Sequence, residues 1–515
     1  MKTSSDFLWR LIQSLSTAEK LFFKRNFTVS ATGDQHLYLK VFDALSRQKK
    51  YDEPALLSKF APVLNRKNIA FTKHYLQTQV SEAIVHYDCR NSIAQKIFKQ
   101  IQLIRLYRQK GMPEEAHAIW KKAVFLARKN EAFGLLGLLK NEFEKIILFS
   151  NHHTSYDDLH KIFENRLISY NEYSQMMVLR DLYTETILLK RNAHFDLDDK
   201  LEKRIKELLN IVNDIGDKQY GTSFWFRHYF RMNKGTLLYL LNQMDEALQL
   251  FKESWKDWKA FPQFLDGEGE FYIELMYMIN YAGIIQHDYD YVEDVFNDKV
   301  NEQLTEPGQR ANFEVVKYLA LNKIYNKTAR YKKVEQLIAT MKSKFKQWEP
   351  VLTDDLNITV LGSLGIGCFV LEQYSDALYF MKKAISIARE GTREDLVSTI
   401  QLLLLLTSYS MNNSKLFDSQ YRTTYAYFYK QKKKHSFESA LVHCLNRTFY
   451  MKDNQSKIKE YGATMEIFAA HKNENVQQMA FNIFNFDGWL KSRIQRIPYR
   501  KFVENKVKEE NLVIA

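Results

Sequence analysis

The chain has 515 residues, of which 45% are apolar and 26% are charged, as is ordinary for a globular protein. Its 74 Lys and Arg exceed its 61 Asp and Glu, giving a formal net charge of +13 that favours acidic partners. Only 7 Pro and 17 Gly interrupt it. Because both residues break helices and no sustained period-two alternation indicates a sheet, the sequence predicts an all-α fold.

Neither a membrane span nor a secretion signal is predicted. The longest strongly apolar run, 402–406, is far shorter than the roughly 20 residues that a membrane-spanning helix needs. Asp6 and Arg10 interrupt the opening where a signal peptide needs an apolar core. The three cysteines are far apart and lack a C-x-x-C spacing, which is typical of reduced thiols. We therefore expect a cytoplasmic protein without a metal or cofactor.

The first 90 residues are predicted to form helices that lack the repeat described below. Ser16 and Glu19 have the spacing of a capping box at a helix start. Further helices are expected from about 34 to 49, over 53–60 and over 67–88.

Two interpretations of the last two of these helices remain open. They loosely resemble a helix-turn-helix, in which polar and basic side chains would contact DNA: Arg66, Lys67, Asn68, Lys73 and His74. However, the linker 61–66 is long for the tight turn of such a unit. A cap that covers the apolar face of a following helical array explains the same residues more simply. We favour a cap over residues 1–90.

Helix pairs are predicted over 91–472. In the stretch 361–389, a small residue in each helix lets the two helices touch, namely Gly365 in the first and Ala377 in the second. The same slots are filled at lower fidelity by Gly235 with Ala247, and by Ala116. Small residues at these positions predict closely packed antiparallel pairs.

The second-helix slot recurs with a period of about 43 residues. Its members are Ala116, Leu159, Leu201, Ala247, Val292, Val334, Ala377, Phe417 and Ile458. Successive members are 43, 42, 46, 45, 42, 43, 40 and 41 residues apart. Only the three alanines belong to independently recognisable motifs, and these three fall on the same ladder.

The stretch LGSLGIGCFVLEQYSDALYF approaches the tetratricopeptide pattern W-x2-L-G-x2-Y…A-x3-F. Over roughly 92–472 the chain resembles the tetratricopeptide-repeat-like superfamily, although the consensus Trp and the closing Pro are missing. The opening SLSTAEKLFFKRNF resembles a group of bacterial helical-repeat proteins of unknown activity. The resemblance implies a right-handed α-solenoid of antiparallel helix pairs over 91–472. Residues 473–515 are expected to form a closing helix and a tail.

Motifs that suggest chemistry have simpler structural explanations. The glycines at 362, 365 and 367 lack the flanking strand and Lys of a phosphate loop, so close helix packing is preferred. A polar cluster is interpreted as a solvated loop rather than a metal site: His152, His153, Asp157, Asp158 and His160. An acidic run is interpreted as a helix start: Asp288, Asp290, Asp294 and Asp298. No nucleophile–base pattern is present, so we predict that the protein is not an enzyme.

The partner-binding surface is predicted on a concave wall made by the first helix of each pair. Residues about 100° round from the packing face, such as Ile366 and Phe369, are expected to face the groove. The wall residues predicted to bind are Arg105, Arg108, Tyr239, Tyr277, Tyr281, Lys323, Lys327, Arg447 and Tyr450. Tyrosines provide rigid contact area and arginines pair with carboxylates. The same wall suits stacked single-stranded bases, and core packing is the alternative for each residue.

Two basic runs are interpreted as solvated helix faces, with an anionic partner as the alternative: Lys430, Lys432, Lys433 and Lys434, and Lys491, Arg493, Arg496, Arg500 and Lys501. The sequence therefore predicts a scaffold that binds an acidic protein or peptide. The second hypothesis is a nucleic-acid-binding or peptide-responsive transcription regulator. The third is an enzyme with its site in the hollow of the solenoid.

Overall fold

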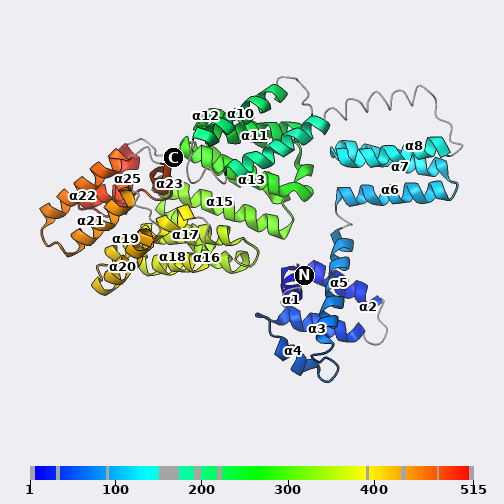
Figure 1. The fold of residues 1–515 in the computed structure, drawn as a ribbon, viewed down its shortest axis with the longest axis horizontal. Helices are drawn as coiled ribbons and strands as arrows, with labels where there is room; N and C mark the ends of the chain where they lie inside the picture. The colour runs from blue at the N-terminus through cyan, green and yellow to red at the C-terminus, as the bar shows by residue number, and fades with distance from the viewer. Residues whose placement is uncertain are drawn as a thin grey trace. The chain divides into compact units, whose positions relative to one another are not determined.

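The computed structural model describes residues 6–29, 35–88, 92–149, 173–190, 199–216, 223–389, 394–430, 436–471 and 475–509. Within these ranges the chain is helical almost throughout and contains no strand (Figure 1). Its internal contacts divide it into two compact units, Met1–Tyr173 and Ser174–Ala515. The predicted all-α fold is confirmed, and the two units are described separately below.

The first unit begins with five helices around a common core: α1 (Phe7–Ser14), α2 (Thr17–Val29), α3 (Gln35–Arg47), α4 (Glu53–Phe60) and α5 (Ile69–Asp88). Their core includes Ile12, Phe23, Phe42 and Leu76, each almost fully buried. The predicted capping box starts α2, because the Ser16 backbone N–H donates to Glu19 Oε2 at 2.7 Å. In return, the Glu19 backbone N–H donates to Ser16 Oγ at 3.3 Å.

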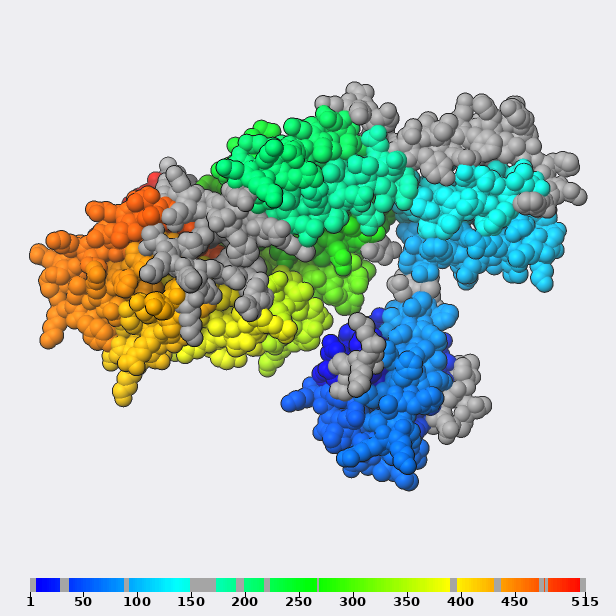
Figure 2. All heavy atoms as spheres, in the orientation of Figure 1, coloured from blue at the N-terminus to red at the C-terminus, as the bar shows by residue number. Residues whose placement is uncertain are grey.

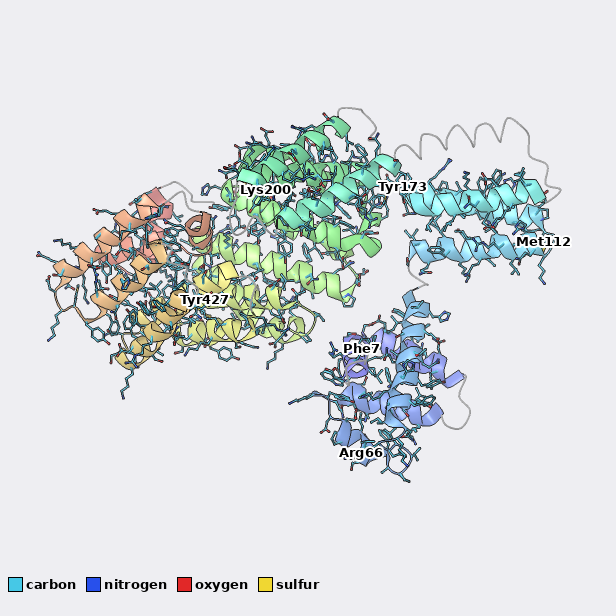
Figure 3. The ribbon with its side chains drawn as sticks, viewed as in Figure 1. Phe7, Arg66, Met112, Tyr173, Lys200 and Tyr427 are labelled. Atoms are coloured by element: carbon cyan, nitrogen blue, oxygen red, sulfur yellow. The ribbon has the colours of Figure 1, made fainter. Side chains whose placement is uncertain are left out.

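One of the candidate DNA contacts has an internal role. Lys73 Nζ lies 2.7 Å from Glu53 Oε2 and 2.8 Å from the Tyr51 hydroxyl oxygen, which ties α5 to α4. Its ammonium group is therefore already paired. Arg66 lies in the turn between α4 and α5, where its side chain is exposed (Figure 3).

The first unit continues with α6 (Ile93–Gln109), α7 (Pro113–Lys129) and α8 (Phe133–Phe149), which share a second core. Gly111 adopts a left-handed φ of 75° in the turn between α6 and α7. Trp120 stacks on Phe143 with ring centroids 4.2 Å apart, and its indole N–H donates to the Leu139 carbonyl at 2.8 Å. Ala116 is fully buried where α7 meets α6.

The second unit is a run of helices in which pairs are joined by short turns (Figure 1). Its described elements are a helix over 173–190, α10 (Asp199–Gly216), α11 (Phe224–Leu240), α12 (Met244–Ala260), η1 (Pro262–Phe264), α13 (Leu265–Ile285), α14 (Tyr289–Asn297), η2 (Lys299–Gln303), α15 (Pro307–Lys327), α16 (Tyr331–Trp348), α17 (Asp354–Val370), α18 (Tyr374–Ile387), α19 (Glu394–Ser410), α20 (Ser414–Lys430), α21 (Ser436–Tyr450), α22 (Asn454–Ala470), α23 (Asn475–Ile483), α24 (Phe486–Ile494) and α25 (Tyr499–Glu509).

A left-handed residue marks the turn inside each of five pairs: Asn242, His287, Ala329, Glu372 and Asn412, with φ between 53° and 62°. Successive members are 45, 42, 43 and 40 residues apart. Each lies five residues before the buried member of the predicted ladder in the following helix, as Gly111 does in the first unit. A left-handed residue satisfies the last carbonyls of the first helix and lets the chain reverse. The predicted antiparallel pairs are therefore confirmed.

Glycines bring the two helices of a pair together. A Cβ at Gly235 would lie 2.6 Å from a ring carbon of Phe251, and one at Gly365 would lie 2.6 Å from Met381 Cγ. Real Cβ atoms do not approach other atoms this closely, so any side chain at these positions would force Phe251 or Met381 to shift. Ala247 and Ala377 are fully buried at the opposing positions.

The pairs stack into two layers. The first helices α11, α13, α15, α17, α19 and α21 pack on one another in order. Asparagine amides link some of them: Asn322 in α15 donates to the Ser363 carbonyl in α17 at 3.0 Å. The second helices are linked by ion pairs, such as Nη1 of Arg330, which immediately precedes α16, with Glu293 Oε2 of α14 at 2.7 Å. We call these the first-helix layer and the second-helix layer.

The C-terminal end differs from the single closing helix predicted over 474–497. The structure has two helices there, α23 and α24, and the expected tail contains a further helix, α25. Asn485 starts α24, because its side-chain oxygen accepts from the Gly488 backbone N–H at 2.8 Å. These helices fold back on the repeats: the Tyr331 hydroxyl of α16 donates to the Arg500 carbonyl at 3.2 Å.

Candidate functional site

Five of the predicted wall residues lie on three neighbouring first helices of the second unit: Tyr239 of α11, Tyr277 and Tyr281 of α13, and Lys323 and Lys327 of α15. We call these five the first-helix patch. The Tyr239 and Tyr281 rings are 6.5 Å apart, and Tyr281 retains 36% of its exposure. Burial raises the pKa of Tyr239 to about 12, so its hydroxyl stays protonated at neutral pH.

The two lysines of the first-helix patch are one helical turn apart and only partly exposed. Burial lowers the pKa of Lys323 to about 8, and the neighbouring charge of Lys327 adds to the effect. Burial also lowers the pKa of Lys327, with a contribution from Lys506. Among the residues that the structure describes, no carboxylate lies within 4.0 Å of either ammonium group. The site therefore holds two poorly solvated cations without a counter-charge.

Other predicted wall residues already have partners. Arg105 Nε lies 2.7 Å from Glu142 Oε1, whose side chain is fully buried. Arg447 pairs with Glu460 at 3.0 Å, and the Tyr450 hydroxyl donates to Asp418 at 2.5 Å.

Arg108 lies in the last turn of α6 and is partly exposed. Its buried Nε has no hydrogen-bond acceptor in the described part of the chain. Arg105 and Arg108 belong to the first unit, whereas the first-helix patch belongs to the second. The binding roles of these residues stay predictions.

The expectation that Phe369 faces an open groove is wrong. Phe369 is 3% exposed, because Phe484, between α23 and α24, covers it; the two ring centroids lie 5.4 Å apart. Ile366 of the same helix is partly exposed. The sequence did not indicate that the chain's own C-terminal helices occupy this place.

The motifs that suggested chemistry have structural roles where they are described. Gly362, Gly365 and Gly367 all lie inside α17, each against a side chain of a neighbouring helix. Asp288 precedes α14 and pairs with Lys252 at 2.6 Å. No group of three or more His, Cys, Asp or Glu suited to a metal occurs in the described ranges. The cluster His152 to His160 lies outside them.

A cavity of about 500 Å³ lies in the second unit where α17, α19 and α21 end and α24 and α25 close over them. We call it the C-terminal cavity. Its charged lining residues are Lys457, Arg493, Arg496, Arg500 and Glu372. Its aromatic lining residues are Phe369, Tyr374, Tyr409, Phe449, Tyr461, Trp489 and Tyr499. Figure 2 shows part of the surrounding helices, α19 to α22, as the yellow to orange region of the surface.

The aromatic side chains of the C-terminal cavity form a connected set. The Tyr409 and Tyr461 hydroxyl oxygens are 2.6 Å apart, and the Tyr409 ring packs edge-on against Trp489 with centroids 5.7 Å apart. Burial raises the pKa of Tyr461 and of Tyr499 well above the ordinary value, so both are neutral donors. The guanidinium of Arg493 lies over Trp489, 4.7 Å from its ring centroid.

The C-terminal basic run is divided by the structure. Arg493, Arg496 and Arg500 line the cavity, whereas Lys491 pairs with Asp487 at 2.7 Å. Lys501 pairs with Glu504 at 3.3 Å. The local spacing of carboxylates separates Arg493 and Arg496 from the two lysines, because neither arginine has an acidic residue three or four positions away. It does not single out Arg500, which lines the cavity although Glu504 lies four positions later.

No family model matches the chain, and no curated protein matches it in sequence. Among solved structures, it is similar to the apo form of RapI, with 13% identity, 81% of this chain and 98% of that chain covered, and a TM-score of 0.44. It is also similar to a Rap protein complexed with competence and sporulation factor, with 12% identity, the same coverage and a TM-score of 0.43.

A third similar structure is aspartyl phosphate phosphatase F from Bacillus subtilis, with 15% identity, 81% and 94% coverage, and a TM-score of 0.40. The helix pairs and left-handed turn residues of the chain itself, rather than these distant likenesses, define its fold as a helical repeat of antiparallel pairs. No described helix combines the length and apolar character that crossing a membrane requires.

Proposed function

We propose that this tetratricopeptide-like protein is a non-enzymatic scaffold that binds an acidic segment of a protein or peptide along the first-helix patch. The observation that carries the proposal is the pair Lys323 and Lys327, partly buried on α15 without a carboxylate partner among the described residues. A buried cation is costly until it is paired. An incoming carboxylate would therefore gain more here than at a solvated lysine.

The tyrosines explain why an extended segment rather than a free ion is the preferred ligand. Tyr239, Tyr277 and Tyr281 lie on α11 and α13, which lead up to α15 in the first-helix layer. Aromatic side chains supply large contact areas and lose little conformational entropy on binding. A segment that crosses the successive first helices can place apolar side chains on the tyrosines and a carboxylate on the lysines.

The test compares two double variants that remove the same charge. The probe is a fluorescein-labelled short peptide in which Glu alternates with Leu and Phe, and anisotropy is measured with the full chain. Lys323→Met with Lys327→Met is expected to weaken binding at least about tenfold, because charge-assisted hydrogen bonds contribute about 1.5–3 kcal/mol each. Lys332→Met with Lys346→Met, at exposed positions of α16, should leave affinity unchanged.

Further arms separate the alternatives. A peptide with Gln in place of Glu should bind much more weakly, and equal binding would contradict the proposal. Equal losses in the two double variants would show general charge attraction instead of a site. If only single-stranded RNA binds, with affinity that falls steeply with salt, the nucleic-acid hypothesis replaces this one.

A further inference from the structure

We propose that the C-terminal cavity binds a small organic anion with a planar, apolar body. Its phosphate or carboxylate group would pair with Arg493, Arg496 and Lys457, and its ring would lie among the aromatic side chains that line the cavity. This site is separate from the first-helix patch and does not depend on the scaffold function.

The side-chain charges of the cavity favour an anion. Four cationic side chains line it against one carboxylate, Glu372. Arg500 is partly neutralised by Glu504, which lies 3.6 Å from its Nε. Helix ends do not reverse this balance: α17, α19, α21 and α24 end at the cavity while α18, α22 and α25 begin there, so their partial charges nearly cancel. The net field is positive.

Buried donors without acceptors point to the same class of ligand. Trp489 is fully buried, and its indole N–H has no hydrogen-bond partner in the described part of the chain. The Nε of Arg493, one turn further along α24, also lacks an acceptor there. Buried donors of this kind are normally paired, because leaving them unpaired costs free energy. Both groups can only donate, so what they lack is an acceptor.

The size and lining of the cavity define the body of the ligand. About 500 Å³ falls within the range of sites for small molecules and is too small for a folded partner. Tyr409 and Phe449 pack edge-on with ring centroids 5.5 Å apart, and Tyr409 meets Trp489 in the same way. Flat aromatic groups pack well against such rings, whereas a free inorganic anion would leave them unused.

The experiment is isothermal titration calorimetry of the full chain with a panel of probes: adenosine monophosphate, phenyl phosphate and benzoate, beside inorganic phosphate and uncharged adenosine. At least one ring-bearing anion is expected to bind saturably, at least about tenfold more tightly than inorganic phosphate. Adenosine should bind more weakly than its monophosphate by a similar factor. Each tenfold corresponds to about 1.4 kcal/mol.

Variants locate the site. Arg493→Gln and Lys457→Met are each expected to lower affinity about tenfold, and Trp489→Phe should lower it severalfold because it removes the indole N–H and part of the ring while keeping an aromatic side chain. Lys459→Met is the control, since Lys459 is exposed on α22 and does not line the cavity. Thermal melts check that each variant is folded. If Arg493→Gln does not fold, Lys457→Met still tests whether the ligand binds in the cavity.

Three outcomes would overturn the proposal. One is that no ring-bearing anion binds at millimolar concentration. Another is that Lys459→Met reduces affinity as much as Lys457→Met does. The third is that a short peptide ending in Phe binds only with its free terminal carboxylate while the small anions do not, which would make the cavity a site for chain ends.

Discussion

Two sets of lysines in the second unit, one in each layer of helices, differ in whether a carboxylate pairs with them. In the second-helix layer, cations meet carboxylates of a neighbouring element: Lys342 of α16 pairs with Asp376 of α18 at 2.5 Å, and Lys252 of α12 pairs with Asp288 at 2.6 Å. In the first-helix layer, Lys323 and Lys327 of α15 have no such partner among the described residues. Lysine is thus paired at these second-helix positions and unpaired, within the described ranges, at these two first-helix positions, whereas Arg447 of the first-helix layer pairs with Glu460.

We infer from this difference that the paired cations stabilise the fold and that the two unpaired lysines serve binding. Pairs between second helices join successive repeats, so their loss should weaken the fold. The partly buried, unpaired ammonium groups of Lys323 and Lys327 carry a desolvation cost, so replacing these lysines with an uncharged residue of similar length should stabilise the fold. A protein retains such a cost where a function needs strained or poorly solvated groups. The predictions below test this division, beginning with the largest expected effect.

The first prediction concerns the pH dependence of Lys323. Its pKa is lowered to about 8 in the folded state, below the roughly 10.4 of an unfolded lysine. At pH values below 8 both states are protonated, and the folded state carries the full cost of the buried charge. That cost disappears as the pH rises above the unfolded pKa. The free energy of unfolding should therefore rise with pH relative to a variant without the amine.

Lys323→Met should be more stable than the natural chain by about 2 kcal/mol near pH 7, and the difference should shrink towards about pH 10. Urea unfolding of both chains at several pH values measures this difference. Titration of lysines and tyrosines that do not interact with Lys323 occurs in both chains and cancels, whereas Lys327 is coupled to Lys323 through its charge. Lys332→Met, at an exposed position, provides the baseline. A difference that is constant with pH would show that Lys323 is well solvated.

The second prediction concerns an ion pair between second helices. Glu293 accepts from Arg330 Nη1 at 2.7 Å, from Lys333 Nζ at 3.3 Å and from the Tyr325 hydroxyl at 2.9 Å. The Glu293 and Arg330 side chains are only 17% and 19% exposed. Glu293→Ala leaves these donors without a carboxylate and should lower the free energy of unfolding by about 1.5–2 kcal/mol, between the values for exposed and buried pairs.

Glu349→Ala is the matched control for Glu293→Ala. Glu349 pairs with Lys383 at 2.8 Å, but these side chains are 40% and 31% exposed. Because solvent screens such a pair, its loss should cost less than about 1 kcal/mol. Equal losses in chemical denaturation would mean that burial does not determine the strength of these links.

The repeat itself was predictable because its signals are local. An apolar position every 43 residues or so, filled by alanine at 116, 247 and 377, indicates helix pairs without knowledge of distant residues. Val292, Val334 and Phe417, which no motif singled out, are fully buried on the same ladder as Ala247 and Ala377. The division between α23 and α24 was harder to predict, because the apolar periodicity continues through Asn485 although that residue starts α24.

The candidate sites were only partly predictable, because they depend on contacts between distant segments. Nothing local to Phe369 shows that Phe484, more than a hundred residues later, will cover it. The C-terminal cavity likewise assembles from residues between 369 and 500. Lys323 was selected by its helical face, but its lack of a carboxylate partner depends on which helices pack beside α15. Periodicity thus predicts the face of a helix, whereas pairing requires the tertiary fold.

The last prediction concerns the contact that holds the two layers together. Gly365 of the first-helix layer touches Met381 of the second, and an added Cβ would lie 2.6 Å from Met381 Cγ. Gly365→Ala gains about 1 kcal/mol of helix propensity but incurs about 1–3 kcal/mol of overpacking. We expect a net loss of about 1 kcal/mol in the free energy of unfolding.

Gly462→Ala is the matched control, because Gly462 also lies inside a helix, α22, and an added Cβ there meets nothing within 4 Å. The only expected effect is the higher helix propensity of alanine, which should raise the free energy of unfolding by about 0.5–1 kcal/mol. Opposite signs for the same substitution, measured by urea unfolding, would show that close contact between the layers depends on glycine at Gly365. A stabilising Gly365→Ala would mean that Met381 moves aside at little cost and that the two layers are less tightly joined than the structure indicates.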